Sequence, residues 1–137
     1  MLRGRPITTV AVAAPRRLRK GAVDFARVPL LHTRPRAEDW RRWLDHAGFH
    51  AVPVRGGSTF ESATQTMEAV AADLGLAIAI EGLLGPDLAS GRVAIAHPVR
   101  RPTRRLFTLQ YETRFAADPS MAAFADWLCG ALGAEAG

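Results

Sequence analysis

Short apolar runs alternate with helical repeats along the chain. Residues 7–14 (ITTVAVAA) are rich in β-branched and small apolar side chains, and a second apolar run lies at 28–32. Both runs are predicted to form strands, because β-branched side chains fit a pleated surface. Residues 76–80 have no polar alternation, which is typical of a strand covered on both faces. A short strand is predicted at 93–96, and residues 104–112 alternate as a strand does.

Three other segments repeat their apolar residues with the period of an α-helix. The first covers residues 35–49 and is predicted to end at Gly48, and the second begins near Ser62 and is predicted to end at Gly75. The third opens with Asp118 as its N-cap and a proline at the first helical position. The predicted buried stripes are Trp40, Trp43, Leu44 and Ala47 in the first helix, Met67, Val70, Ala71 and Leu74 in the second, and Met121, Phe124, Leu128 and Leu132 in the third.

The order of these elements predicts the fold class. A turn or short helix, PRRLRKG, is also predicted after the first strand. With it, the order is strand, helix, strand, helix, strand, turn, strand, strand, helix. This alternation favours an α/β protein with a mostly parallel sheet flanked by helices. In such sheets, ligands gather at the carboxyl ends of strands and the amino ends of helices.

Length and composition narrow the class of protein. A chain of 137 residues fits one domain, and 48% hydrophobic with 23% charged residues is typical of a soluble globular protein. No apolar run is long enough to cross a bilayer, and the first residues lack the apolar segment of a secretory signal. We therefore expect a cytoplasmic protein without a membrane partner. The single cysteine, Cys129, excludes an internal disulfide, and its apolar helical surroundings favour a packed thiol.

The positive charge belongs to one end of the chain. Residues 1–36 contain nine basic residues and one acidic residue, a net charge of +8, whereas the remainder sums to −3. The arginines are scattered among prolines and apolar residues without interleaved aromatic residues. This pattern favours a solvated basic face over a nucleic-acid surface.

The segment that begins the second helix, GGSTFESATQT, is unusually rich in small polar groups. Ser58 with Glu61, and Ser62 with Gln65, both have the spacing of a capping box, and one box is sufficient to begin the helix. The surplus hydroxyls and the unpaired amides of a helix start also suit a carboxylate or phosphate. Capping and anion binding both remain open, but a nucleotide-binding P-loop is excluded because no lysine follows the glycines.

Other candidate chemistry is weak. His46 and His50 have the spacing of metal ligands on a helix, but Gly48 is predicted to end that helix between them. His32 follows a buried strand and is predicted to be a hydrogen-bonded structural histidine. No motif places a nucleophile beside a base, and the basic run at 100–105 is most simply a solvated loop. We therefore expect no enzyme activity, no metal and no cofactor.

Five segments in register resemble one known family. They are PLLHTRPRAEDWRRWLDHAGF, the FESAT entry into a helix, the AADLGLAI end of that helix, the segment DLASGRV, and the closing helix with its spaced Pro, Phe, Asp, Trp and Leu. Over residues 7–132 they resemble the effector-binding domain of LysR-type transcriptional regulators, in the branch of the glycine-cleavage activator. The resemblance implies a fold similar to type 2 periplasmic binding proteins, with two α/β lobes joined by crossover strands.

On this resemblance, the chain is a partial effector-binding domain. Residues 9–113 correspond to the distal lobe, and residues 114–137 to a return segment and a terminal helix that belongs to the other lobe. The family's winged helix-turn-helix has no counterpart in the sequence, so we expect no direct DNA binding by this chain.

The resemblance also implies a site and partners. Ligand contacts in the family come from the start of the helix that Ser62 begins, which selects Phe60, Ser62 and Thr64, with Phe107 on a strand that borders the cleft. The implied function is sensing of a small polar or carboxylate-bearing effector in a cleft between lobes, coupled to transcription through a separate DNA-binding part. The implied partners are the effector and either further copies of the chain or the missing lobe. The alternative is a dimerisation fragment that senses nothing.

Overall fold

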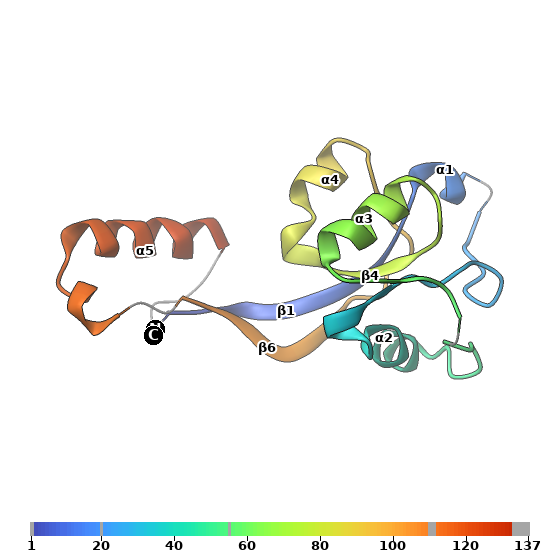
Figure 1. The fold of residues 1–137 in the computed structure, drawn as a ribbon, viewed down its shortest axis with the longest axis horizontal. Helices are drawn as coiled ribbons and strands as arrows, with labels where there is room; N and C mark the ends of the chain where they lie inside the picture. The colour runs from blue at the N-terminus through green and yellow to red at the C-terminus, as the bar shows by residue number, and fades with distance from the viewer. Residues whose placement is uncertain (1, 20, 55, 110–111, 133–137) are drawn as a thin grey trace. The chain divides into compact units, whose positions relative to one another are not determined.

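The computed structural model describes residues 2–19, 21–54, 56–109 and 112–132. The chain divides into a larger unit, Thr8–Arg101, and a smaller unit made of Met1–Ile7 and Pro102–Gly137. Two strands, β1 (Leu2–Ala13) and β6 (Arg101–Leu109), each contain a boundary between the units. Figure 1 shows the elements of both units along the chain.

The larger unit is built on a sheet with β1 in its middle. Strands β4 (Ala77–Ile80) and β5 (Ala94–Ile95) pair with β1, and β6 also pairs with it. Thr9 lies opposite Ile80, and Val12 lies opposite both Ala77 and Ile95. Both of these pairings are antiparallel.

The expectation of a mostly parallel sheet is therefore wrong for β1 and its partners β4 and β5. The expectation assumed that each strand lies beside the next strand of the chain. In the structure β1 is followed by the four-residue helix α1 (Pro15–Leu18), but its partners β4 and β5 come later in the chain. The apolar pattern of these strands indicates their burial and does not indicate their direction. Parallel pairing occurs between β2 (His32–Thr33) and β3 (Thr59–Phe60), and in one bridge between Leu30 and Leu76.

The period of two along β1 and β4 divides the core into two clusters, one on each face of the sheet. Val10 and Val12 of β1 belong to the first cluster with Val70, whereas the intervening Ala11 and Ala13 belong to the second cluster with Trp43. All of these side chains are fully buried. The apolar strands predicted at 7–14 and 76–80 thus form the middle of the core, because helices cover both of their faces.

Helix α2 (Asp39–Ala47) covers the second cluster, as its sequence predicts. Trp40, Trp43 and Leu44 are buried, and Gly48 ends the helix with φ of +88°. The indole of Trp40 donates a hydrogen bond of 2.8 Å to the carbonyl of Leu31, so this buried donor has an acceptor.

Helix α3 (Ala63–Ala71) covers the first cluster, but not through all of the predicted side chains. Val70, Ala69 and Thr66 are buried, whereas Leu74 is 58% exposed. The helix ends before Gly75, because Asp73 already turns the chain with φ of +63°. Gly75 has another role: a Cβ there would collide with the carbonyl of Pro29, so glycine lets the strand segments at Leu30 and Leu76 approach each other.

Short helices complete the larger unit. They are the 3-10 helices η1 (Arg34–Arg36) and η2 (Glu81–Leu83) and the α-helix α4 (Gly85–Ala89). In Figure 1, α3 and α4 lie on one side of β1 and β4, and α2 lies on the other. The larger unit therefore has three layers, with the sheet in the middle and helices on both of its faces.

The smaller unit contains most of β6, the 3-10 helix η3 (Thr113–Phe115) and helix α5 (Pro119–Leu132). Asp118 accepts a hydrogen bond of 2.8 Å from the amide of Ser120, which confirms the predicted helix start. The predicted apolar stripe of α5 is only partly covered, since Phe124 is 47% and the neighbouring Trp127 67% exposed. Leu132 lies outside the residues whose side chains the structure describes.

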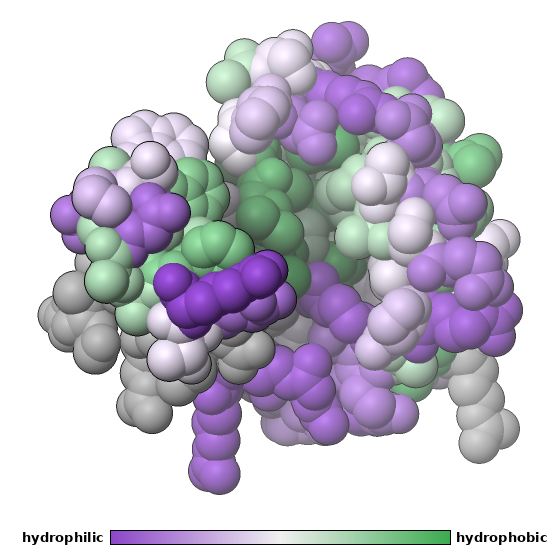
Figure 2. Space-filling view, turned by 60° about the vertical axis from the view of Figure 1, so that its left-hand side comes forward, coloured by the Kyte–Doolittle hydropathy of each residue, from purple (hydrophilic) through white to green (hydrophobic). Residues whose placement is uncertain are grey.

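Hydrophobic side chains reach the surface in both units. Figure 2 shows hydrophobic residues in green among hydrophilic residues in purple on the face that it draws. Among the described residues, no helix is long and apolar enough to span a membrane. The large exposed hydrophobic residues are Leu74, Leu83, Leu106, Phe124 and Trp127.

Candidate functional site

The start of α3 uses the second of the two predicted capping boxes. Ser62 is extended, with φ of −137° and ψ of 158°, and its Oγ accepts a hydrogen bond of 3.3 Å from the amide of Gln65. The side-chain oxygen of Gln65 in turn accepts a hydrogen bond of 3.1 Å from the amide of Glu61. Capping therefore explains Ser62 and Gln65 without any ligand.

Capping leaves two donors of α3 unused. Among the described residues, no group accepts a hydrogen bond from the amide of Ala63 or from that of Thr64. Ser62, Ala63 and Thr64 are all exposed, so their own chain does not cover this end of the helix. Two exposed amides at the positive end of the helix dipole suit an anionic or polar group.

The neighbouring strands bring further polar side chains to the same place. Because β2 and β3 are parallel and in register, with Thr33 opposite Phe60, their carboxyl ends meet beside α3. Thr33 is the last residue of β2, and its hydroxyl forms a hydrogen bond of 2.8 Å with the hydroxyl of Thr66, which lies in the first turn of α3. The next residue, Arg34, donates from Nε to the carboxylate of Glu61 at 2.8 Å.

The pair of Arg34 and Glu61 is open to solvent, because their side chains are 64% and 69% exposed. An ion pair this exposed contributes little to stability. The guanidinium of Arg34 is nevertheless a cationic group near the start of α3 that is available to an anion. A carboxylate-bearing molecule at this place would compete with Glu61 for Arg34.

The structure brings three of the four predicted site residues together. Phe60 ends β3, is partly buried and packs against the first core cluster. Ser62 is the cap, and Thr64 lies exposed in the first turn of α3. The side chain of Phe107 lies outside the described residues, so its proposed place at the cleft is untested.

Reasoning from the sequence missed Thr33, Arg34 and Thr66. Thr66 lies four residues after Ser62, which is the spacing of one helical face, and this signal was available. Thr33 and Arg34 follow His32 at the end of the predicted strand, but only the pairing of β2 with β3 shows that they meet α3. Nε2 of His32 donates a hydrogen bond of 3.1 Å to the carbonyl of Gly56, as predicted for a hydrogen-bonded histidine.

An open groove of about 640 Å³ runs beside α3 and β3. Phe60, Ala69, Ala72 and Leu74 line its apolar part, and Glu61 and Glu68 are among its polar lining residues. The exposed Leu74 therefore faces a groove rather than the core. The full lining consists of Thr59, Phe60, Glu61, Gln65, Glu68, Ala69, Ala72 and Leu74.

One carboxyl near β2 has a perturbed pKa. Burial raises the pKa of Asp39 above its ordinary value of 3.8, and this effect outweighs the opposing charge and hydrogen bond of Arg36. Asp39, in the first turn of α2, forms an ion pair with Arg36 of η1, and their side chains are about one-fifth exposed, at 22% and 21%. This pair lies beside Thr33 in a small polar cavity, too small for more than a water molecule.

Ion pairs neutralise much of the basic character of the larger unit. Eight of its arginines lie within 4 Å of a carboxylate: Arg16, Arg17, Arg27, Arg34, Arg36, Arg41, Arg92 and Arg100. This pairing favours the predicted solvated face over a surface that tracks phosphates. Helix α2 contains His46 but ends at Gly48, so His50 lies outside it, as predicted. Nδ1 of His50 lies 3.5 Å from Oδ1 of Asp45.

The family model described as the LysR substrate binding domain matches residues 6–132. The chain belongs to this LysR family. Over 107 residues, or 78% of the chain, this LysR domain is 39% identical to the HTH-type transcriptional regulator TrpI of Pseudomonas aeruginosa. It spans 36% of that relative's length.

Two solved structures show the same fold at low identity. The effector domain of AmpR from Pseudomonas aeruginosa is 22% identical, with a TM-score of 0.74 over 96% of this chain and 64% of the other. Full-length LysG from Corynebacterium glutamicum with bound effector Arg is 22% identical, with a TM-score of 0.62 over 98% of this chain and 47% of the other. The α/β fold class similar to type 2 periplasmic binding proteins is thus confirmed for this LysR domain.

The family also decides the functional class. This LysR domain is the effector-binding domain of a transcriptional regulator, and the family is not one of enzymes. Of the two structures, that of LysG contains its bound effector, Arg.

Proposed function

We propose that this LysR domain binds a small polar or carboxylate-bearing effector at the start of α3. The observation that carries the proposal is the pair of exposed amides of Ala63 and Thr64, for which the described residues hold no acceptor. Membership of the LysR family supports it, because the domain of this family senses small molecules.

The groups at this place favour a particular chemistry. The two amides and the dipole of α3 suit an oxyanion, and the hydroxyls of Ser62 and Thr64 add short-range donors. Arg34 supplies a guanidinium that can hold a carboxylate, while Glu61 supplies an acceptor for an ammonium group. The effector Arg in the LysG structure is itself an amino acid, which supports including amino acids among the candidates.

The effector is proposed to lie in a cleft that needs a second lobe. This chain spans 64% of the AmpR effector domain that it resembles, and 36% of TrpI. The exposed Phe124 and Trp127 of α5 offer an apolar surface for the remaining lobe or for another copy of the chain. Residues 9–113 remain the proposed distal lobe, and residues 114–137 the proposed return segment.

The proposed regulation is a shift between conformations. An effector that binds the closed arrangement of the lobes better than the open one raises the population of the closed arrangement. The closed arrangement would then alter an oligomer and, through a separate DNA-binding part, DNA-templated transcription. No chemical step on the effector is involved.

A thermal-stability screen tests this function. The wild-type protein is heated with a panel of single amino acids and small organic acids, each at a concentration well above its expected Kd. A true effector raises the unfolding temperature, since a ligand at about 100 times its Kd adds about 2.7 kcal/mol to the free energy of unfolding. A well-folded sample that no member of a broad panel stabilises would count against a competent site.

A further inference from the structure

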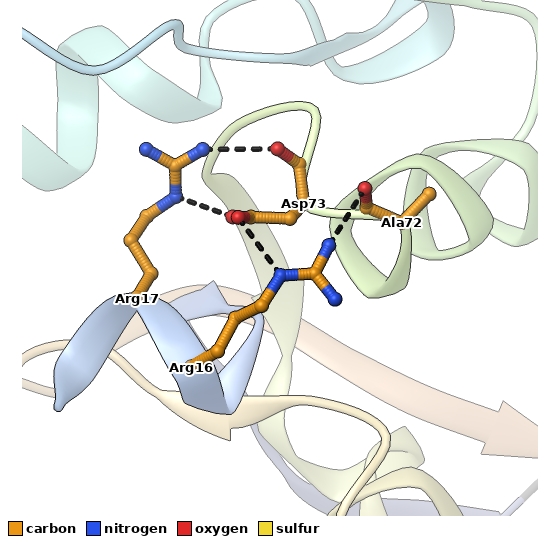
Figure 3. A network of polar contacts seen from close by, with 4 residues as sticks. All are labelled: Arg16, Arg17, Ala72 and Asp73. Carbon is orange, nitrogen blue, oxygen red and sulfur yellow. Dashed lines mark hydrogen bonds and ion pairs between the residues drawn. The ribbon is translucent and has the colours of Figure 1, made fainter.

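Two arginines of α1 hold the far end of α3 (Figure 3). Nε of Arg16 donates to Oδ2 of Asp73 at 3.0 Å, and Nε of Arg17 donates to Oδ1 at 2.6 Å. Nη2 of Arg16 also donates to the main-chain carbonyl of Ala72 at 3.1 Å, and Nη2 of Arg17 donates to that of Asp73 at 2.9 Å. We call these four residues the Asp73 clamp. Since each guanidinium spans two acceptors, its plane and its distance from the helix are both fixed.

Asp73 occupies a position where glycine is the usual residue. It follows the last turn of α3 with φ of +63°, and it is the one non-glycine residue with positive φ among those that the structure describes. Glycine adopts this conformation without steric penalty, whereas aspartate does not. What aspartate adds is a carboxylate, and here both of its oxygens are used by the clamp.

The other half of the clamp is attached to the centre of the sheet. Arg16 and Arg17 lie in α1, which begins at Pro15, two residues after the end of β1. The last residues of β1, Val12 and Ala13, are fully buried between the two core clusters. The clamp therefore joins the C-terminal end of α3 to the end of a strand that the core holds in place.

The clamp adds to the contacts that hold α3 in place. Thr66, Ala69 and Val70 bury one side of the helix against the core. Sliding along the helix axis would also break the four hydrogen bonds of the clamp at its C-terminal end. A helix of nine residues is a rigid rod of about 14 Å, so a shift at Asp73 moves the amides of Ala63 and Thr64 equally.

We propose that Asp73 is a positioning residue for effector binding, which acts through Arg16 and Arg17 to fix the amides at the opposite end of α3. The inference rests on the proposed function of that helix start. Asp73 itself does not touch the effector. The Asp73 clamp sets where the two free amides lie relative to Arg34, which follows a different strand.

The test uses acetate as a simple carboxylate probe at neutral pH. Acetate is titrated into the isotopically labelled full chain at constant ionic strength, and its Kd is obtained from the NMR shifts of the Ala63 and Thr64 amides. The variants are Asp73→Gly, which suits the backbone conformation, and Asp73→Asn, which keeps the side-chain shape. Glu81→Gln is the matched control, because it removes an ion pair of 2.6 Å with Arg100 elsewhere in the unit. The unfolding temperature of each protein is measured in parallel.

The positioning role predicts that acetate binds about fivefold more weakly to Asp73→Gly, a modest coupling between distant sites. Asp73→Asn is expected to fall between this variant and the wild type, and Glu81→Gln is expected to bind acetate as the wild type does. A purely structural role predicts lower unfolding temperatures with unchanged acetate affinity, and that result would overturn the inference. If acetate shifts neither amide in the wild type, the proposed site itself fails, and the positioning role fails with it.

Discussion

Ser62 has two tasks at the start of α3. Its hydroxyl caps the amide of Gln65, and its exposed position beside the free amides of Ala63 and Thr64 makes it a proposed ligand contact. Both tasks use the same oxygen, since a hydroxyl can accept one hydrogen bond while it donates another.

Replacing this hydroxyl separates the two tasks. Ser62→Ala is expected to lower the free energy of unfolding by about 1 kcal/mol, the usual effect of losing an N-cap. It is also expected to weaken binding of the ligand found by the thermal screen, measured by calorimetry. Ser58→Ala is the control, because no described group bonds to the hydroxyl of Ser58. A variant that loses stability but keeps full ligand affinity would favour the dimerisation fragment over the sensor.

The partly buried carboxyl of Asp39 gives a pH dependence whose sign follows from the direction of its pKa shift. Because burial raises its pKa above 3.8, the folded state holds this proton more tightly than the unfolded state does. The contribution of Asp39 to stability is therefore fully present below pH 3.8 and is lost as the pH rises through the raised pKa.

Asp39→Asn removes this titration. We expect the variant to gain stability relative to the wild type as the pH rises from about 4 to 7. Urea unfolding at several pH values measures the difference. A difference that stays constant, or that moves in favour of the wild type, would show that the pairing with Arg36 outweighs burial.

At the scale of elements, the helices show where sequence patterns succeed. The stripe of Trp40, Trp43 and Leu44 was predictable because Gly48 marks the end of α2 and no other face is apolar. In α3 almost every face contains alanine or another small residue, so the spacing of its apolar residues does not predict which face is buried. The structure buries Thr66 and exposes Leu74, since the chain has already turned at Asp73.

Truncating one leucine from each region tests these assignments. Leu44→Ala is expected to lower the free energy of unfolding by about 2 to 5 kcal/mol, because Leu44 is fully buried. Leu74→Ala is expected to change it by about 0.5 kcal/mol or less, because Leu74 is 58% exposed. Chemical denaturation of the two variants compares them directly. Equal losses would mean that Leu74 belongs to the core, as the helical period alone predicts.

At the scale of the whole molecule, the sequence predicts the α/β class but not the sheet. The apolar runs at 7–14 and 76–80 predicted two buried strands, but their residues do not indicate that β1 and β4 pair antiparallel. An apolar pattern indicates the burial of a strand and not its direction, and several helices and strands lie between β1 and its partner β4 in the chain. Of the candidate site, the sequence indicates residues 60–64. The contributions of Thr33 and Arg34 were not predictable, because they depend on the pairing of β2 with β3.

The exposed face of α5 predicts association. Trp127 is 67% exposed, so Trp127→Gln is expected to change the free energy of unfolding by about 0.5 kcal/mol or less. The same change is expected to reduce self-association of the chain, measured by sedimentation velocity, if this face engages another copy or lobe. Ala122→Gln, at another exposed position of α5, is the control. Unchanged sedimentation of the Trp127 variant would exclude this residue from the interface.

The central claim is that the first amides of α3 hold the effector, and removing one amide tests it most directly. Proline is well tolerated at the first position of a helix, and the extended Ser62 before it suits a following proline. Ala63→Pro therefore deletes the donor while keeping the helix. Calorimetry with the ligand from the thermal screen is predicted to show binding weaker by about 10-fold to 100-fold, the loss of one hydrogen bond to a charged group. Full affinity in a folded Ala63→Pro variant would contradict the claim.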